Sequence, residues 1–440
     1  MTSIEMYTSY QCPCCHSTEK LSLFSHEGNL PWKFESWRHV DHQRSENRED
    51  TKGVKFSRTT DSLGVYFSAA SHITESSEAA NHTSFIQEAG LTVNGRDWSG
   101  KGQHVQYKKG DRPPLTHIAH VNVSGNVGID EVSWGRVRLA RKTVKCVGRV
   151  KLESAMKEVI HLQHLRHPHV IQLVGTYLQG HDFAILLYPV ADFDLDKFLD
   201  KGHMLSYDHA KEGSYDDQLW RAFSCLASAV AYVHDQGIKH MDIKPRNILV
   251  KRMSCKRFRI YITDFDIARK VAPDEDSNTN GPTGRTPRYC APEVAVGGDV
   301  PRSRSADIFS LGCVYLEIFT VIVGESRDSF EEFRSGTDAT FSNNLRKVID
   351  WLQLLIDGVN SPETRSDPRF WRIKTFQFED VSVFNDISST FRKMLSIDPN
   401  IRPTAEEVSW EFPKELCCYD DPLPLQEEGE EQKTCRLSLD

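Results

Sequence analysis

The chain of 440 residues lacks the features that mark several large classes of protein. Its formal net charge is −8, so it has no excess of positive charge of the kind that binds nucleic acid or anionic membranes. No apolar run follows a basic start at the N-terminus, so we expect no secretory signal and an intracellular protein, either cytoplasmic or nuclear. The 11 cysteines are odd in number and scattered, which predicts free thiols in a reducing compartment and not a disulfide framework.

Long hydrophobic runs are scarce as well. One stretch, IFSLGCVYLEIFTVIVG at residues 308–324, approaches the length of a membrane span. It is short for a span, it contains Glu317 near its middle, and Asp307 directly precedes it. We therefore expect a buried helix of a large domain and no membrane partner.

Three regions of different character follow one another along the chain. Residues 1–117 are polar and irregular, as in HQRSENREDTKG, and we expect a mostly disordered N-terminal extension there. Residues 118–412 contain the apolar strand and helix patterns of a folded domain. Residues 413–440 include DDPLPLQEEGEEQ, which predicts an acidic, flexible tail.

Within residues 118–412 the patterns change from strands to helices. Short strand patterns come first, interrupted by one helical pattern, LESAMKEVIHLQHLRH, which ends before Pro168. Helical patterns dominate afterwards, beginning with QLWRAFSCLASAVAYVHDQG. This order predicts an α+β protein with a small strand-rich half and a larger helical half.

The segment HMDIKPRNILV, residues 240–250, combines polar side chains that suit phosphoryl transfer. In that reaction a carboxylate such as Asp242 orients the attacking hydroxyl and accepts its proton, and Lys244 offsets the developing charge. The Asn247 amide oxygen and a second carboxylate can hold Mg²⁺. Asp264, in ITDFDIA after a strand pattern, supplies that second carboxylate.

These two segments resemble the catalytic loop and the magnesium loop of the eukaryotic protein kinase family. Other motifs follow in the order of that family: LARK, KEVIHLQHLRHPHVIQLVGTY, TPRYCAPE, SADIFSLGCVYLEI and DPNIRPTAEEV. The resemblance covers residues 118–412. It implies a two-lobed α+β fold with a small β-rich N-lobe at 118–187, containing one helix, and a large helical C-lobe at 191–412.

The resemblance also implies roles for single residues. Lys142, paired with Glu158, would position the ATP phosphates, and Asp307 would hold the catalytic loop. Arg402 would pair with Glu293. The residues implied in binding ATP are Gly125, Gly128, Val132, Ala140, Lys142, Tyr188, Val190, Asp194 and Leu249. Leu187 would lie at the back of the same pocket.

The resemblance implies a kinase that transfers the γ-phosphoryl group of Mg·ATP to a protein substrate, with no nucleic acid bound by the kinase domain. Lys244 and Thr286 resemble the residues that the serine/threonine branch of the family has at these positions. Met241 replaces the Arg that normally pairs with a phosphorylated activation segment, so activity should not depend on phosphorylation of that segment.

Two further departures leave an alternative open. Asp266 replaces a Gly beside the metal site, and VNVSGNVGIDEV is a poor match to the glycine-rich loop that covers the phosphates. The alternative function is therefore a pseudokinase scaffold that binds nucleotide or partners without phosphoryl transfer.

A cysteine and histidine cluster in the N-terminal extension, residues 12–42, is a second candidate site. Cys12 and Cys15 have zinc-ligand spacing, and His39 and His42 would complete a Zn²⁺ site. The long gap between the two pairs favours the other interpretation, an unstructured segment that contains these residues by chance.

Overall fold

The computed structural model describes residues 7–11, 18–22, 97–146, 149–205, 215–254, 257–270, 287–295, 303–336, 338–361 and 382–412. The chain divides into two compact units, Met1–Ala70 and Ser71–Asp440. In the first unit, strands β1 (Tyr7–Gln11) and β2 (Thr18–Ser22) pair antiparallel. The expected tail at 413–440 lies outside the described residues.

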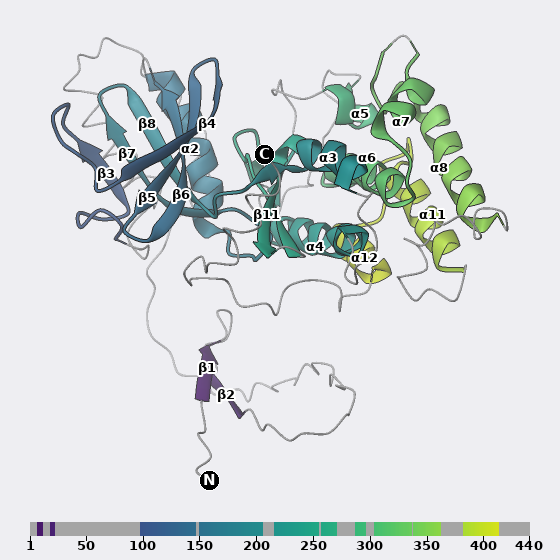
Figure 1. Ribbon diagram of the computed structural model, residues 1–440, viewed down its shortest axis with the longest axis horizontal. Helices are drawn as coiled ribbons and strands as arrows, with labels where there is room; N and C mark the ends of the chain where they lie inside the picture. The colour runs from purple at the N-terminus through teal and green to yellow at the C-terminus, as the bar shows by residue number, and fades with distance from the viewer. Residues whose placement is uncertain are drawn as a thin grey trace, which may run out of the picture. The chain divides into compact units, whose positions relative to one another are not determined.

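The small lobe of the second unit is a six-stranded sheet with the order β3-β7-β8-β6-β5-β4 (Figure 1). Its strands are β3 (His104–Tyr107), β4 (Thr116–Ser124), β5 (Val127–Trp134), β6 (Val137–Lys145), β7 (Gln172–Gln179) and β8 (Asp182–Tyr188). Strand β3 runs parallel to β7, and the other neighbours are antiparallel. Helix α2 (Arg149–His164) packs against β7 and β8. The predicted β-rich lobe with one helix is confirmed.

The sheet of the small lobe begins upstream of residue 118. Trp98 is 1% exposed, and its indole Nε1 donates to the Gln103 carbonyl at 2.8 Å. Its ring packs against Tyr107 and Tyr177, with centroid distances of 6.4 and 5.9 Å. Residues 97–117, which we assigned to the N-terminal extension, thus form part of the lobe and enclose a second hydrophobic core.

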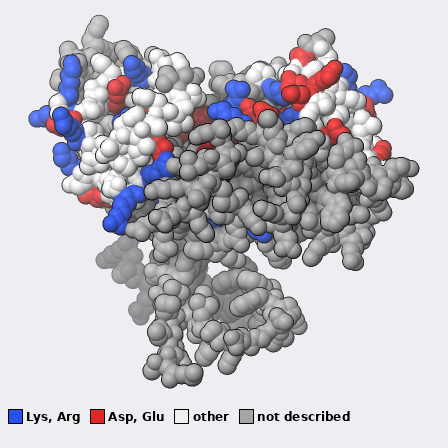
Figure 2. Space-filling view, in the orientation of Figure 1, with Lys and Arg blue, Asp and Glu red and all other residues white. Residues whose placement is uncertain are grey.

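The large lobe is mainly helical, as predicted (Figure 1). Its helices are α3 (Leu195–Leu205), α4 (Tyr215–Asp235), α5 (Pro292–Ala295), α6 (Ser305–Ile322), α7 (Arg327–Arg334), α8 (Leu345–Asn360), α11 (Ser382–Met394) and α12 (Ala405–Glu411). Its strands are β9 (Phe193–Asp194), β10 (Ile238–Lys239), β11 (Ile248–Ser254), β12 (Arg257–Ile262) and β13 (Arg269–Lys270). Short 3₁₀ turns are η2 (Pro245–Asn247) and η3 (Pro287–Tyr289). Figure 2 shows charges of both signs on the visible face, with acidic side chains gathered over α7.

Helix α6 is the central helix of the large lobe. Among the described residues it is the one helix long and apolar enough to cross a membrane, and 94% of it is buried inside the protein. A helix that is apolar on all sides belongs in a core or in a membrane, and this burial identifies a core helix. The buried helix predicted for residues 308–324 is confirmed.

A buried ion pair ties the end of the large lobe to α5. Arg402 forms a two-pronged contact with Glu293, with Nη1–Oε1 and Nη2–Oε2 distances of 2.7 and 2.8 Å. The planar guanidinium matches both carboxylate oxygens, which makes this type of pair strong and directional. The predicted pairing of Arg402 with Glu293 is confirmed.

We predict that Gly175→Ala disrupts the packing of residues 97–103 on β7. A Cβ at Gly175 would lie 2.3 Å from Trp98 Nε1 and 2.4 Å from the Gln103 carbonyl oxygen, so buried groups must move. We expect the free energy of unfolding to fall by about 1–3 kcal/mol in chemical denaturation. Gly128→Ala is the matched control, because a Cβ there meets nothing within 4 Å. Equal stability of the two variants would contradict this packing.

Candidate active site

Asp307, in the first turn of α6, anchors the loop that contains the candidate catalytic residues. It is 1% exposed, and its two carboxylate oxygens accept from the backbone N–H groups of His240 and Met241, each at 2.8 Å. His234 Nε2 lies 2.9 Å from the same carboxylate. Burial disfavours the charge, but these hydrogen bonds outweigh it and lower the pKa of Asp307. The expected hold on the loop is confirmed.

The loop brings Asp242, Lys244 and Asn247 into direct contact. Lys244 Nζ lies 2.5 Å from Asp242 Oδ2. Asn247 Nδ2 donates to the same oxygen and to the Asp242 backbone carbonyl, both at 2.9 Å. The amide nitrogen of Asn247 faces Asp242. The amide oxygen of Asn247 is therefore the atom that a cation could use.

Strand pairing brings Asn247 next to Asp264. Strands β11 and β12 pair antiparallel, with Ile248 opposite Ile262. The Thr263 N–H donates to the Asn247 carbonyl at 3.0 Å, which continues this ladder by one step. Two residues that are 17 positions apart in the sequence thereby meet at one end of the strand pair, as the sequence predicted.

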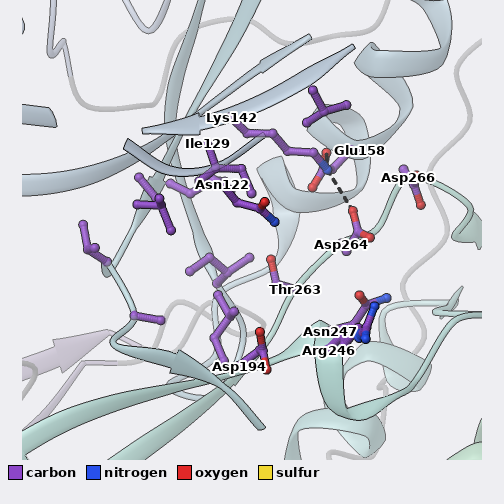
Figure 3. A pocket seen from close by; sticks show the side chains of 18 of the residues that line it. Asn122, Ile129, Lys142, Glu158, Asp194, Arg246, Asn247, Thr263, Asp264 and Asp266 are labelled. Atoms are coloured by element: carbon purple, nitrogen blue, oxygen red, sulfur yellow. Dashed lines mark hydrogen bonds and ion pairs between the residues drawn. The ribbon is translucent and has the colours of Figure 1, made fainter. Parts of the chain in front are cut away.

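Lys142 lies between two carboxylates (Figure 3). Its Nζ is 2.8 Å from Glu158 Oε2 on α2 and 2.8 Å from Asp264 Oδ1. Burial disfavours the Lys142 ammonium, yet Glu158 and Asp264 outweigh it and raise its pKa. Burial raises the pKa of Glu158 against the pull of Lys142, whereas Lys142 overcomes burial and lowers the pKa of Asp264. The Lys142–Glu158 pair has the geometry expected from the sequence.

Lys142, Glu158 and Asp264 border a cavity of about 600 Å³ between the small-lobe sheet and the β9–β11 region. Asp242 and Lys244 are not among the residues that line it. Of the residues predicted to bind ATP or Mg²⁺, those that line it are Ala140, Lys142, Val190, Asp194, Asn247, Leu249 and Asp264. Glu158 and Leu187 line it as well. The cavity is therefore lined by charged groups such as Lys142 and Asp264 and by apolar side chains such as Ala140 and Leu249.

Four predicted nucleotide residues are not among those that line the cavity: Gly125, Gly128, Val132 and Tyr188. Val132 is opposite Leu139, and it is fully buried in the second core with Trp98. Ile129, opposite Lys142, lines the cavity instead, together with Val127 and Asn122. Strands β5 and β6 are joined by the two-residue turn Gly135–Arg136, and counting opposed pairs outward from that turn to Lys142 would have found this face.

The glycine-rich segment forms a tight hairpin turn. Strand β4 ends at Ser124 and β5 begins at Val127, so Gly125 and Asn126 make the whole connection. Gly125 has a φ of 58°, which glycine adopts without strain. Gly128 lies within β5, opposite Val123 and Thr143. Gly125 therefore shapes the turn, and Gly128 is part of the strand. The residues between them, Asn126 and Val127, line the cavity.

Backbone strain falls on residues other than the replaced glycine. Among the described residues, Met241 and Asp264 are the two non-glycine residues with positive φ, each at 69°. Asp266, which replaces the usual Gly, does not have a positive φ. Asp266 lines the mouth of the cavity beside Asp264 (Figure 3). Partial burial and the Asp264 charge raise the pKa of Asp266.

The remaining candidates lie outside the described residues. They are Thr286, Cys12, Cys15, His39 and His42. Their predicted roles stay predictions.

The sequence of this chain matches a known protein family. The model of the protein kinase domain matches residues 132–411. This chain belongs to the protein kinase family. The Lys142–Glu158 ion pair, the Asp242 loop and the cavity all lie within this kinase domain or on strands continuous with it.

Curated kinases are similar at low identity. A receptor-like protein kinase of Arabidopsis thaliana is 28% identical over 52% of this chain and 46% of its own length. A CTD kinase subunit alpha homolog of Encephalitozoon cuniculi is 27% identical over 64% of this chain and 80% of its own length. Cyclin-dependent kinase E-1 of Arabidopsis thaliana is 28% identical over 66% of this chain and 65% of its own length. The chain spans less than half of the first of these relatives.

We predict that Asp307→Asn destabilises the kinase domain and releases the loop. Asparagine offers one acceptor where two backbone N–H groups need partners, so the free energy of unfolding should fall by about 3 kcal/mol at neutral pH. The folded-state pKa of Asp307 lies below its ordinary value of 3.8, so its contribution is full above that value and is lost as the pH falls below it. The difference between parent and variant should therefore narrow in acid. Urea denaturation from pH 3 to 7 measures this, and a constant difference would contradict it.

Proposed function

We propose that this protein is a serine/threonine protein kinase that transfers the γ-phosphoryl group of Mg·ATP to a hydroxyl of a protein substrate. The observation that carries the proposal is the joint placement of Lys142, Glu158 and Asp264 with the Asp242–Lys244–Asn247 loop. All of the polar roles that phosphoryl transfer requires are filled by suitable side chains.

The side chains divide the work by position. Lys142, fixed by Glu158, binds phosphate oxygens of the nucleotide in the cavity. Asp242 accepts a hydrogen bond and then the proton from the substrate hydroxyl, while Lys244, 2.5 Å away, offsets negative charge that develops on the transferred group. Ala140, Leu187 and Leu249 offer the apolar surfaces between which the adenine ring would lie.

The donor set of Asn247 and Asp264 fits Mg²⁺, which the protein kinase family generally uses with ATP. Mg²⁺ prefers oxygen ligands, and the set offers one carboxylate and one amide oxygen at the phosphate end of the cavity. When bound, the ion would neutralise charge on the phosphates. Asp264 would then exchange its contact with Lys142 for the ion, and Glu158 would keep Lys142 in place.

We infer that activity does not depend on phosphorylation of the activation segment. Met241 occupies the position of the usual phosphate-binding Arg and has no charge to offer. Its backbone N–H is already held by Asp307 at 2.8 Å, so the loop is anchored without a phosphate contact. The specificity for Ser and Thr rests on the similarity of Lys244 to that branch of the family.

We predict that Asp242→Asn abolishes phosphoryl transfer and leaves nucleotide binding intact. Asparagine keeps the shape but cannot accept the proton, so the rate should fall by about 10²–10⁴-fold. Transfer of labelled γ-phosphate to a generic Ser/Thr substrate measures the rate, and a thermal-shift assay with Mg·ATP measures binding. Equal transfer by parent and variant would contradict the role of Asp242.

We predict that Asp266→Gly increases the Mg²⁺ concentration needed for half-maximal activity by roughly fivefold. A carboxylate near a bound cation would contribute on the order of 1 kcal/mol to its binding in a solvated site. Asp266→Asn is the matched control, because it removes the charge and keeps the size. A large gain in activity for Asp266→Gly would contradict this and indicate that Asp266 displaces the ion.

The alternative is a pseudokinase scaffold, and one observation favours it. The β4–β5 turn contains a single glycine, Gly125, which is not among the cavity-lining residues, so the backbone cover over the phosphates is weak. A scaffold would show a thermal shift with nucleotide, or none, and no transfer with Mg²⁺ or Mn²⁺. Phosphoryl transfer by the parent protein, together with its loss in Asp242→Asn, would exclude the scaffold function.

A further inference from the structure

A cluster of two histidines and one aspartate lies on strands β4 and β5, away from the proposed active site. Among the described residues, one group of three or more His, Cys, Asp or Glu side chains offers ligand atoms within 4.8 Å of one another, and it consists of His117, His120 and Asp130. The side chains of His117 and His120 are 42% and 76% exposed, whereas that of Asp130 is 11% exposed. The cluster is therefore open to solvent on the histidine side and closed on the carboxylate side.

Irregular strand pairing puts the two histidines on one face of the sheet. Residues three apart in a regular strand point to opposite faces. In β4 the pairing register shifts between His117 and Ala119, so His117 is opposite Val132 and His120 is opposite Asp130. These partners are two apart in β5 and share a face. The extra residue re-aims a side chain, a change for which bulges are known near functional sites.

The two oxygens of Asp130 face different partners. Oδ1 lies 2.5 Å from His120 Nδ1 and 3.7 Å from His117 Nε2. Oδ2 accepts from Arg141 Nη2 at 2.7 Å and from Arg141 Nε at 3.2 Å. Arg141 thus fixes the carboxylate and leaves Oδ1 directed at the imidazoles. Metal-binding carboxylates are typically held from behind in this manner.

The spacing of the ligand atoms suits a small transition-metal ion. Zn²⁺ binds imidazole nitrogen and carboxylate oxygen at about 2.0–2.2 Å, which places tetrahedral ligand atoms roughly 3.3 Å apart. The distances of 2.5 and 3.7 Å from Oδ1 bracket this value, so small rotations of exposed imidazoles suffice. Two nitrogen ligands argue against Mg²⁺ and Ca²⁺, which prefer oxygen.

From this arrangement we infer that His117, His120 and Asp130 form a Zn²⁺ site on the outer face of the β4–β5 strand pair. Solvent completes the coordination on the exposed side. The ion ties β4 to β5, and through Asp130 and Arg141 it ties both strands to β6, which carries Lys142. Nothing in this inference depends on phosphoryl transfer.

The site lies back to back with the nucleotide cavity. Val121 follows His120 and Ile129 precedes Asp130, and both Val121 and Ile129 line the cavity. A bound ion would therefore restrict the β4–β5 strand pair, from which Val121 and Ile129 line the cavity. Figure 1 shows these two strands in the small lobe. Zinc would act as a conformational clamp on the small lobe, separate from Mg²⁺ at Asn247 and Asp264.

Zinc titration of the full chain by calorimetry tests the inference. The chain carries Cys12→Ser, Cys14→Ser and Cys15→Ser throughout, which removes the three thiols near the N-terminus. We expect one more equivalent of Zn²⁺ to bind to this chain than to its His117→Ala/His120→Ala variant. Each single histidine variant should bind that equivalent at least about tenfold more weakly, since even an outer partner of a ligand contributes 10–100-fold.

His164→Ala is the matched control, because His164 is an exposed histidine elsewhere on the small lobe and should bind zinc like the parent. The melting temperature supplies a second readout. Zn²⁺ should raise it in the parent and in His164→Ala, and not in the double variant. Equal stoichiometry and affinity in parent and double variant would overturn the inference and leave His120–Asp130 as a surface ion pair.

Discussion

The buried ammonium of Lys142 is the constraint on which the active-site arrangement depends. A charge in this position is stable only if opposite charges surround it. Glu158 from α2 and Asp264 from the loop after β12 meet that need, each at 2.8 Å. Three separate elements from both lobes are thereby fixed relative to one another. The same contacts place the Lys142 ammonium and the Asp264 carboxylate side by side at the border of the cavity.

A second buried charge organises the other half of the site. Asp307 receives the His240 and Met241 N–H groups and so shapes the loop from the side of α6. The His240 ring contacts the Phe265 ring in a tilted arrangement, with a centroid distance of 4.6 Å, and Phe265 is fully buried next to Asp264 in the sequence. The Asp307 and Lys142 centres are therefore connected through buried side chains of the core.

The sequence was informative wherever chemistry requires a side chain at a fixed spacing. The residues Lys142, Glu158, Asp242, Asn247 and Asp264 could be named because order and spacing together define their roles. The face of β5 was misassigned, because Val132 and Ile129 are both β-branched and a bulged neighbour hides the register. Residues 97–117 were missed because β3 has four residues and Trp98 is an isolated aromatic in a polar segment. Its burial depends on Gly175, which is distant in sequence.

The two unusual motif residues affect the site in different ways. Met241 adopts a φ of 69°, a conformation that costs a non-glycine residue about 1 kcal/mol, and the Asp307 contact to its N–H compensates. Asp266 needs no such conformation, since its φ is not positive. Its effect is electrostatic, because it adds a carboxyl beside Asp264 where a glycine would add nothing. A like charge at this point repels Asp264, and it would attract the cation that we propose at Asn247 and Asp264.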